Sequence, residues 1–117
     1  PFELVRLHLP EPEVGSGRLL ATVLTVDRFG NMALNVSRDH VDSLGLGLGD
    51  WVELQFALDS YYAKVAETYA DADPGELILY EDSYGAVSVA IRDGNAARLT
   101  GATAGDRVRI HTRRGPD

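Results

Sequence analysis

The chain has 117 residues and a formal net charge of −7, with 44% hydrophobic and 25% charged residues. This length suits one domain, which buries roughly two thirds of the surface of its unfolded chain. The acidic balance argues against a nucleic-acid partner, because binding to a phosphate backbone depends on clustered basic side chains. The absence of cysteine excludes disulfides and thiolate zinc sites. Without a secretory signal or a membrane-spanning apolar run, we expect a cytoplasmic protein with no membrane partner.

The first segment of the chain is rich in proline, at Pro1, Pro10 and Pro12. Proline fixes φ and lacks an amide donor, so residues 1–16 are predicted to form an extended linker or edge segment. The chain starts at proline and its only methionine is Met32. We therefore expect it to be a fragment of a longer polypeptide.

Short apolar runs separated by turn signals follow from residue 17 to residue 112. This pattern predicts an all-β domain, a small β-barrel with one or two short helices. The predicted strands are 18–26, 32–36, 50–58, 61–68, 77–80, 87–91 and 107–112, with short helices at 38–44 and 94–99. Residues 113–117 are expected to fray.

Alternation of apolar and polar residues along these strands predicts which side chains are buried, since one face of each strand should be wet. The predicted core consists of Val23, Val26, Val52, Leu54, Phe56, Leu77, Leu79, Val87, Val89, Val108 and Ile110. Arg107 and Arg109, which alternate with the last two, are predicted to face solvent.

Residues 49–54 and 105–110 share the pattern Gly-Asp-Xaa-Val-Xaa-Leu/Ile, and each follows a predicted helix. We interpret the pair as a turn that begins a strand and is used twice. Two copies are too few for a solenoid repeat.

A polar turn, Asp27-Arg28-Phe29-Gly30-Asn31, follows the first predicted strand. Gly30 marks a place where the backbone needs a conformation that other residues avoid. Asp27 can accept hydrogen bonds or hold a cation, and Asn31 can both donate and accept. The turn therefore has two interpretations: a ligand site, or an Asx turn whose side chains only cap backbone amides.

Other candidate chemistry is weak. His8, His40 and His111 fall on unrelated segments, so no metal site is expected. The acidic residues between 71 and 82 lack EF-hand spacing and are interpreted as a solvated loop. Ser83 has no neighbouring histidine that would indicate nucleophilic catalysis. The loop tyrosines Tyr69 and Tyr84 are either stacking surfaces for a ligand or lids over the core.

Taken in order, three segments resemble the C-terminal domain of the S-adenosylmethionine hydroxide adenosyltransferases. These adenosine-forming hydrolases are related to the fluorinase and chlorinase enzymes. The segments are 26–35, then 68–76 with its Pro-Gly-Glu, and then 83–97, and the pattern closes with Gly105-Asp106. The resemblance implies a C-terminal β-barrel that follows an N-terminal α/β domain. It also implies homotrimers with active sites between the two kinds of domain from neighbouring subunits.

The resemblance also implies roles for individual residues in binding S-adenosylmethionine. For the methionine portion, Asp27 would hold the amino group, while Ser83 and the backbone at Tyr84 would take the carboxylate.

For the adenosine portion, Asn31 would hydrogen-bond the adenine, and Tyr69 would stack beside it, where the fluorinase has Phe. Backbone groups near Ile91 and Asp93 would complete the adenine edge.

Two departures from the fluorinase favour the hydroxide-using branch of the family. The fluorinase has Arg where this chain has Ile91, and one residue more between the Asp and the Phe of the polar turn. The chain also has Arg92 in place of the family's usual Asn.

No catalytic residue, metal or cofactor is assigned to this chain, since the implied water-activating residues belong to the N-terminal domain. The alternative is a non-catalytic barrel that binds adenosine or serves assembly.

Overall fold

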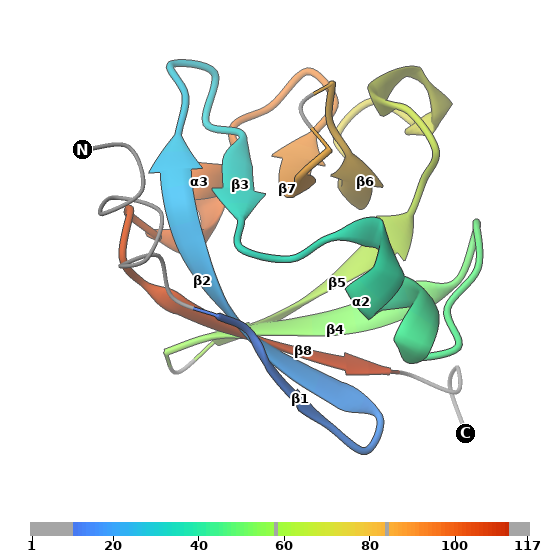
Figure 1. Ribbon diagram of the computed structural model, residues 1–117. Coiled ribbons are helices and arrows are strands. Elements are labelled where there is room, and N and C mark those ends of the chain that lie inside the picture. The colour runs from blue at the N-terminus through green and yellow to red at the C-terminus, as the bar shows by residue number, and fades with distance from the viewer. Residues whose placement is uncertain (1–10, 58, 84, 113–117) are drawn as a thin grey trace.

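Eight strands form one sheet that curves round and closes on itself, as the computed structural model shows (Figure 1). The structure describes residues 11–57, 59–83 and 85–112. The strands are β1 (Glu13–Gly15), β2 (Arg18–Val26), β3 (Met32–Leu34), β4 (Trp51–Phe56), β5 (Asp59–Val65), β6 (Leu77–Glu81), β7 (Val87–Ile91) and β8 (Arg107–Thr112). The helices are α2 (Arg38–Ser43), α3 (Ala96–Thr100) and the 3₁₀ turn η1 (Tyr69–Asp71).

The strand order β1-β2-β3-β7-β6-β5-β4-β8 is closed by a further pairing between β2 and β8. Strands β2 to β8 therefore form the barrel, and β1 extends it as a hairpin partner of β2. The β5–β6 pair is parallel, whereas the other pairs are antiparallel. The predicted all-β barrel with short helices is confirmed.

Part of the predicted linker belongs to the sheet, because Glu13 pairs with Leu20 and Gly15 with Arg18. The rest of that segment, residues 1–10, and the tail 113–117 lie outside the described residues. The boundaries 1–16, 17–112 and 113–117 stay predictions.

Ten of the eleven predicted core residues are buried, including Val52, Leu54 and Ile110, which are fully inaccessible. The prediction for Val26 is wrong, because this residue is only partly buried at the edge of the core. The register between β2 and β3 shifts between Val23 and Thr25, which interrupts the alternation. Arg107 and Arg109 are exposed, as predicted.

The expectation that every strand has one wet face is wrong for β6 and β7. Strand β7 is buried at all five positions, including the outward-facing Ser88 and Ala90. The chain between β5 and β6 crosses over the outside of these strands and forms a second small core. This outer cluster consists of Ala66, Ala72, Ile78 and Ala90, with Tyr80 packed against it. The crossover carries η1, so the same packing holds η1 against the sheet.

The repeated Gly-Asp pattern forms the same hydrogen bonds in both places. The glycine amide donates to the carbonyl of a valine on a neighbouring strand, and that valine's amide donates back to the aspartate carbonyl. These pairs are Gly49 with Val65 (2.7 Å), Val65 with Asp50 (2.8 Å), Gly105 with Val23 (2.8 Å) and Val23 with Asp106 (2.8 Å). The interpretation as a turn that begins a strand, used twice, is confirmed.

An ion pair joins the crossover to β5, with 3.1 Å between Lys64 Nζ and Glu76 Oε1. Glu76 Oε1 also accepts a hydrogen bond from the Asp73 amide at 3.0 Å. This backbone hydrogen bond, helped by Lys64, holds the pKa of the Glu76 carboxyl below its usual value of 4.5, although burial opposes the shift.

Because folding lowers this pKa, the stabilisation by Glu76 is present above pH 4.5 and lost as the pH falls through the folded value. At pH 7 the urea concentration at the unfolding midpoint is therefore expected to be higher for wild type than for Glu76→Gln. This difference between the two midpoints should shrink below pH 4.5. Urea titrations at pH 7 and pH 3 measure it. A difference that is constant with pH would contradict the assignment.

Among the described residues, no helix is long and apolar enough to cross a membrane.

Candidate functional site

The polar turn between β2 and β3 is held together by its own side chains. Asp27 Oδ1 accepts hydrogen bonds from the amides of Phe29 (2.9 Å) and Asn31 (3.0 Å). Asp27 Oδ2 accepts from Asn31 Nδ2 at 3.2 Å. Asp27 therefore caps backbone amides, as the capping interpretation predicts, whereas the Asn31 side chain donates to the Asp27 carboxylate, which fixes where Asn31 lies.

Gly30 connects the polar turn to α3. Its φ is +84°, in the left-handed region. A Cβ at this position would overlap the side chain of Asn95, which caps α3 by accepting from the Arg98 amide at 2.8 Å. The Gly30 carbonyl also accepts a hydrogen bond from the Ala97 amide at 3.0 Å. The close approach of the turn to α3 therefore requires glycine.

An open cavity of about 530 Å³ lies beside this turn. Figure 1 shows the β2–β3 turn and η1 at the same end of the barrel. Four segments of the chain line the cavity, with three aromatic side chains, two short polar side chains and a glycine. These residues are Phe29, Asn31, Tyr69, Tyr80, Asp93 and Gly94. The arrangement can receive a flat ring between aromatic walls and offer it hydrogen bonds.

Tyr69 connects η1, on which it lies, with the turn after β7, and its side chain lines the cavity. Its hydroxyl donates to the Ile91 carbonyl at 3.2 Å and accepts from the Asp93 amide at 3.0 Å. Its ring meets Tyr80 edge to face, with centroids 6.5 Å apart. Asp93 has a φ of 60°, which turns the chain sharply at this point.

Arg92 makes a second connection between the same two segments. Its Nη1 donates to the carbonyls of Ala70 (3.2 Å) and Ala72 (2.7 Å), on either side of the end of η1. The Arg92 carbonyl accepts from the Gly75 amide at 2.7 Å. Arg92 therefore supports the segment that carries Tyr69 and does not line the cavity.

Carboxylates lie at and beside the cavity, with Asp93 in its lining and Asp27 bonded to Asn31. Burial raises the pKa of the Tyr80 phenol, and the charges of Asp82 and Asp27 raise it further, with a contribution from Tyr69. The carboxylates of Asp82 and Asp27 therefore lie near enough to the Tyr80 phenol to act on its charged form. These carboxylates favour a cation over an anion, whereas the Arg28 guanidinium over the Phe29 ring has the opposite effect.

The family profile of the "SAM hydroxide adenosyltransferase C-terminal domain" matches residues 21–109. The chain belongs to this family. The match spans the polar turn, η1, both tyrosines of the cavity and the turn after β7.

Curated relatives agree with this family assignment. The chain is 41% identical over 94% of its length to an (R)-S-adenosyl-L-methionine hydrolase of Salinispora tropica. A hydrolase with the same name from Salinispora arenicola is 37% identical over 94% of the chain. A fluorinase of Actinopolyspora mzabensis is 34% identical over 83% of the chain. The chain spans 39% of the length of each hydrolase and 33% of the fluorinase.

Solved structures give the same barrel. An uncharacterised conserved protein of Thermotoga maritima superposes with a TM-score of 0.84 at 29% identity, over 88% of this chain and 39% of that one. A conserved hypothetical protein of Thermus thermophilus gives a TM-score of 0.61 at 26% identity, and the match covers 87% of this chain and 38% of the Thermus chain.

The structure brings three of the site residues implied by the family resemblance into one cavity: Asn31, Tyr69 and Asp93. Asp27 adjoins them through its hydrogen bond to Asn31. The side chain of Ile91 is buried, so only its carbonyl reaches the site.

Ser83 is exposed in the β6–β7 turn and is not among the described residues that line the cavity. Its neighbour Asp82 shapes that turn by accepting from the Ala86 amide (3.1 Å) and the Ser88 hydroxyl (2.9 Å). Tyr84 lies outside the described residues. The roles of all these family residues stay predictions.

Sequence reasoning missed Phe29 and Tyr80 as cavity walls and Arg92 as a support. Tyr80 alternates with the buried Leu79 on β6, and this alternation was a signal that its ring faces outward. Phe29 is 61% exposed, and Arg28 stacks on its ring at 5.1 Å from the centroid. Nothing in the sequence indicated that Arg92 reaches η1, because the contact depends on how the crossover packs.

Proposed function

We propose that this chain is the substrate-contacting barrel of an enzyme that hydrolyses S-adenosyl-L-methionine to adenosine and L-methionine. The observation that carries the proposal is the cavity beside the polar turn, in which aromatic walls and a carboxamide lie close to the carboxylates of Asp93 and Asp27. S-adenosylmethionine is an aromatic base joined to a sulfonium and an ammonium. Aromatic faces suit both a purine and a sulfonium, and carboxylates suit both cations.

In the proposed complex, Tyr69 stacks beside the adenine and Asn31 hydrogen-bonds its edge. Asp27 takes the ammonium through the lone pairs that its backbone contacts leave free. Ser83 and the backbone at Tyr84 take the carboxylate at the far end of the substrate. Water or hydroxide attacks the ribose C5′, the C5′–S bond breaks, and methionine leaves with the bonding electron pair.

The whole protein is proposed to carry an N-terminal α/β domain, because the chain spans well under half of its named relatives. That domain would supply the groups that act on the attacking water, so none is assigned here. We further propose a cytoplasmic homotrimer in which each site lies between the barrel of one subunit and the N-terminal domain of another. No cofactor is required, because the positive sulfonium is already an activated leaving group.

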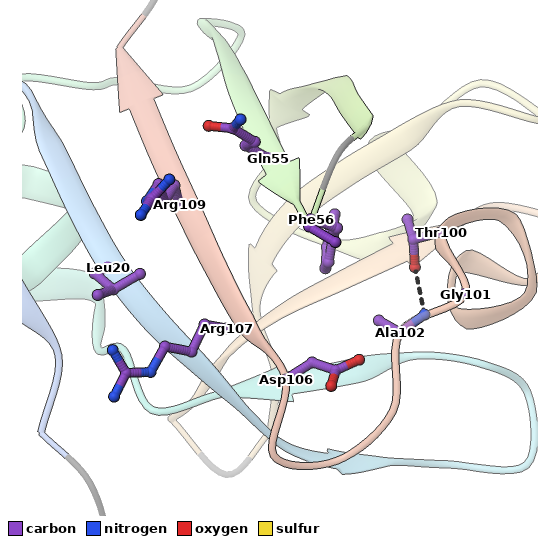
Figure 2. Close-up of a pocket in the computed structure, with 10 residues that line it drawn as sticks. Leu20, Gln55, Phe56, Thr100, Gly101, Ala102, Asp106, Arg107 and Arg109 are labelled. Carbon is purple, nitrogen blue, oxygen red and sulfur yellow. Dashed lines mark hydrogen bonds between the residues drawn. The ribbon is translucent and has the colours of Figure 1, made fainter.

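A second cavity, of about 400 Å³, offers a contrasting chemistry (Figure 2). It lies on the outer face of the barrel beside Leu20 and Gln55, and Arg107 and Arg109 line it. Guanidinium groups disfavour a sulfonium by charge, so this cavity is not proposed as the substrate site.

Replacing Asn31 by alanine is expected to weaken adenosine binding by roughly 1 to 3 kcal/mol, the usual cost of leaving a polar partner unpaired. Isothermal titration calorimetry measures the affinity. Gln55→Ala, in the arginine-lined cavity, serves as the control and should bind adenosine like wild type. Equal affinities of wild type and Asn31→Ala would contradict the site assignment.

A further inference from the structure

The hydroxyl of Tyr69 is hydrogen-bonded to two backbone groups of the turn after β7, the Asp93 amide and the Ile91 carbonyl. The Asp93 amide has one hydrogen, and it donates to Tyr69 at 3.0 Å. The Ile91 carbonyl has two lone pairs, and it accepts from both Tyr69 (3.2 Å) and the Gly94 amide (3.1 Å). These two groups are among the backbone groups near Ile91 and Asp93 that the family resemblance would assign to the adenine edge. In this chain the Asp93 amide and the Ile91 carbonyl already have hydrogen-bond partners within the protein itself.

We propose that Tyr69 is a positioning residue whose hydroxyl holds its ring in place and occupies the Asp93 amide and the Ile91 carbonyl, which we call the closed edge. Recognition of the base is then left to stacking on the ring and to hydrogen bonds with Asn31. The inference rests on the proposed function of the cavity as a nucleoside site. It differs from the family expectation, because it removes the Ile91 carbonyl and the Asp93 amide from base recognition.

The cavity is open while the hydroxyl bonds are intact, so a ligand can enter without moving Tyr69. Two other contacts hold the ring in place. Arg92 binds the carbonyls of Ala70 and Ala72 in the same segment, and Tyr80 packs edge-on against the Tyr69 ring. If Tyr69 moved away, the Asp93 amide and one Ile91 lone pair would lose their partner within the protein. A fixed wall avoids the ordering cost that a mobile ring would pay on binding.

The closed edge has a consequence for base selection. Adenine presents a donor at N6 and an acceptor at N1, whereas hypoxanthine presents the reverse at the same two positions. A fixed backbone donor and acceptor would discriminate between them, because such a pair complements the edge of only one of the two bases. A carboxamide such as Asn31 carries both a donor and an acceptor and can serve either base. Wild type is therefore expected to bind adenosine and inosine with affinities within about fivefold of each other.

The test uses the 117-residue chain, its Tyr69→Phe variant and the matched control Tyr61→Phe. Tyr61 also donates its hydroxyl to a backbone carbonyl, that of Leu99 at 3.2 Å, and is not among the cavity's lining residues. Amide hydrogen exchange of the ligand-free proteins, read by NMR, reports on the turn. Tyr69→Phe should speed exchange at Asp93 by about tenfold or more. Exchange in β7 and the urea midpoint should stay as in wild type. Tyr61→Phe should leave Asp93 unchanged.

Calorimetry with adenosine and with inosine tests base selection. Tyr69→Phe should weaken the binding of adenosine and of inosine by a similar factor, about three- to tenfold. Without its hydroxyl bonds the ring at position 69 is more mobile, and ordering it on binding costs free energy. A larger loss for adenosine than for inosine, or a wild-type preference for adenosine above tenfold, would overturn the closed edge. Tighter adenosine binding by Tyr69→Phe would show instead that the hydroxyl competes with the ligand.

The two proposals fail in different ways. If wild type binds neither nucleoside, the proposed function fails and base selection falls with it. Exchange at Asp93 then still decides whether the hydroxyl fixes the turn, and unchanged exchange would overturn the positioning role.

Discussion

Gly30→Ala is expected to lower the free energy of unfolding by about 3 kcal/mol, from two effects that add at this position. A side chain at a φ of +84° costs about 1 to 2 kcal/mol. The new Cβ would also overlap Asn95, so the N-terminus of α3 must move. Because Asn31 is the next residue, the same displacement should weaken adenosine binding.

Gly101→Ala separates the two effects. Gly101 ends α3 with a φ of 73°, and nothing lies within 4 Å of the position of its Cβ. This variant should lose only the conformational part, about 1 kcal/mol. Urea denaturation followed by circular dichroism measures both variants. Equal losses for Gly30→Ala and Gly101→Ala would show that contact with Asn95 does not matter.

The second large effect concerns catalysis: the 117-residue chain alone is expected not to hydrolyse S-adenosylmethionine. Holding a nucleophile against the reacting carbon is worth roughly 7 to 11 kcal/mol, but only when both are held together. The candidate contacts bind only the two ends of the proposed substrate, and none of them is assigned to the reacting carbon C5′. These contacts are Asp27, Asn31, Tyr69 and Ser83. The cavity is also open to water, which weakens every charge interaction inside it.

The assay incubates the purified chain with each sulfonium epimer of S-adenosylmethionine and separates adenosine and methionine by chromatography. The (R) epimer is included because two relatives are named for it. The full-length Salinispora tropica hydrolase serves as the positive control. Turnover above the buffer blank that Asp27→Ala abolishes would show that the barrel itself is catalytic. Adenosine binding by a whole natural protein that shows no turnover would favour the alternative of a non-catalytic module.

Local pattern was enough to predict most of the barrel. Along β4 and β8, apolar residues such as Val52, Leu54 and Ile110 alternate with polar ones, and they are buried as predicted. A strand with one wet face shows this period because its burial depends only on which way each side chain points. The two Gly-Asp turns were predictable for a similar reason, since their geometry depends on adjacent residues.

Burial on β6 and β7 was not predictable in the same way. Ile78 and Ala90 face outward, and only the crossover that packs over them makes those positions dry. The register shift between β2 and β3 likewise interrupts the alternation of buried and exposed residues before Val26. That shift depends on how the two strands pair.

By itself, then, the sequence determined the fold class, most of the core and the polar turn, because each depends on contacts between near neighbours. Only the tertiary structure decided which residues share a cavity. Asn31, Tyr69 and Asp93 meet because the crossover lies on the outside of the barrel and because Arg92 and the Tyr69 hydroxyl join it to the turn after β7. Those contacts of the Tyr69 hydroxyl link residues more than twenty positions apart, and no local pattern in a single sequence records them.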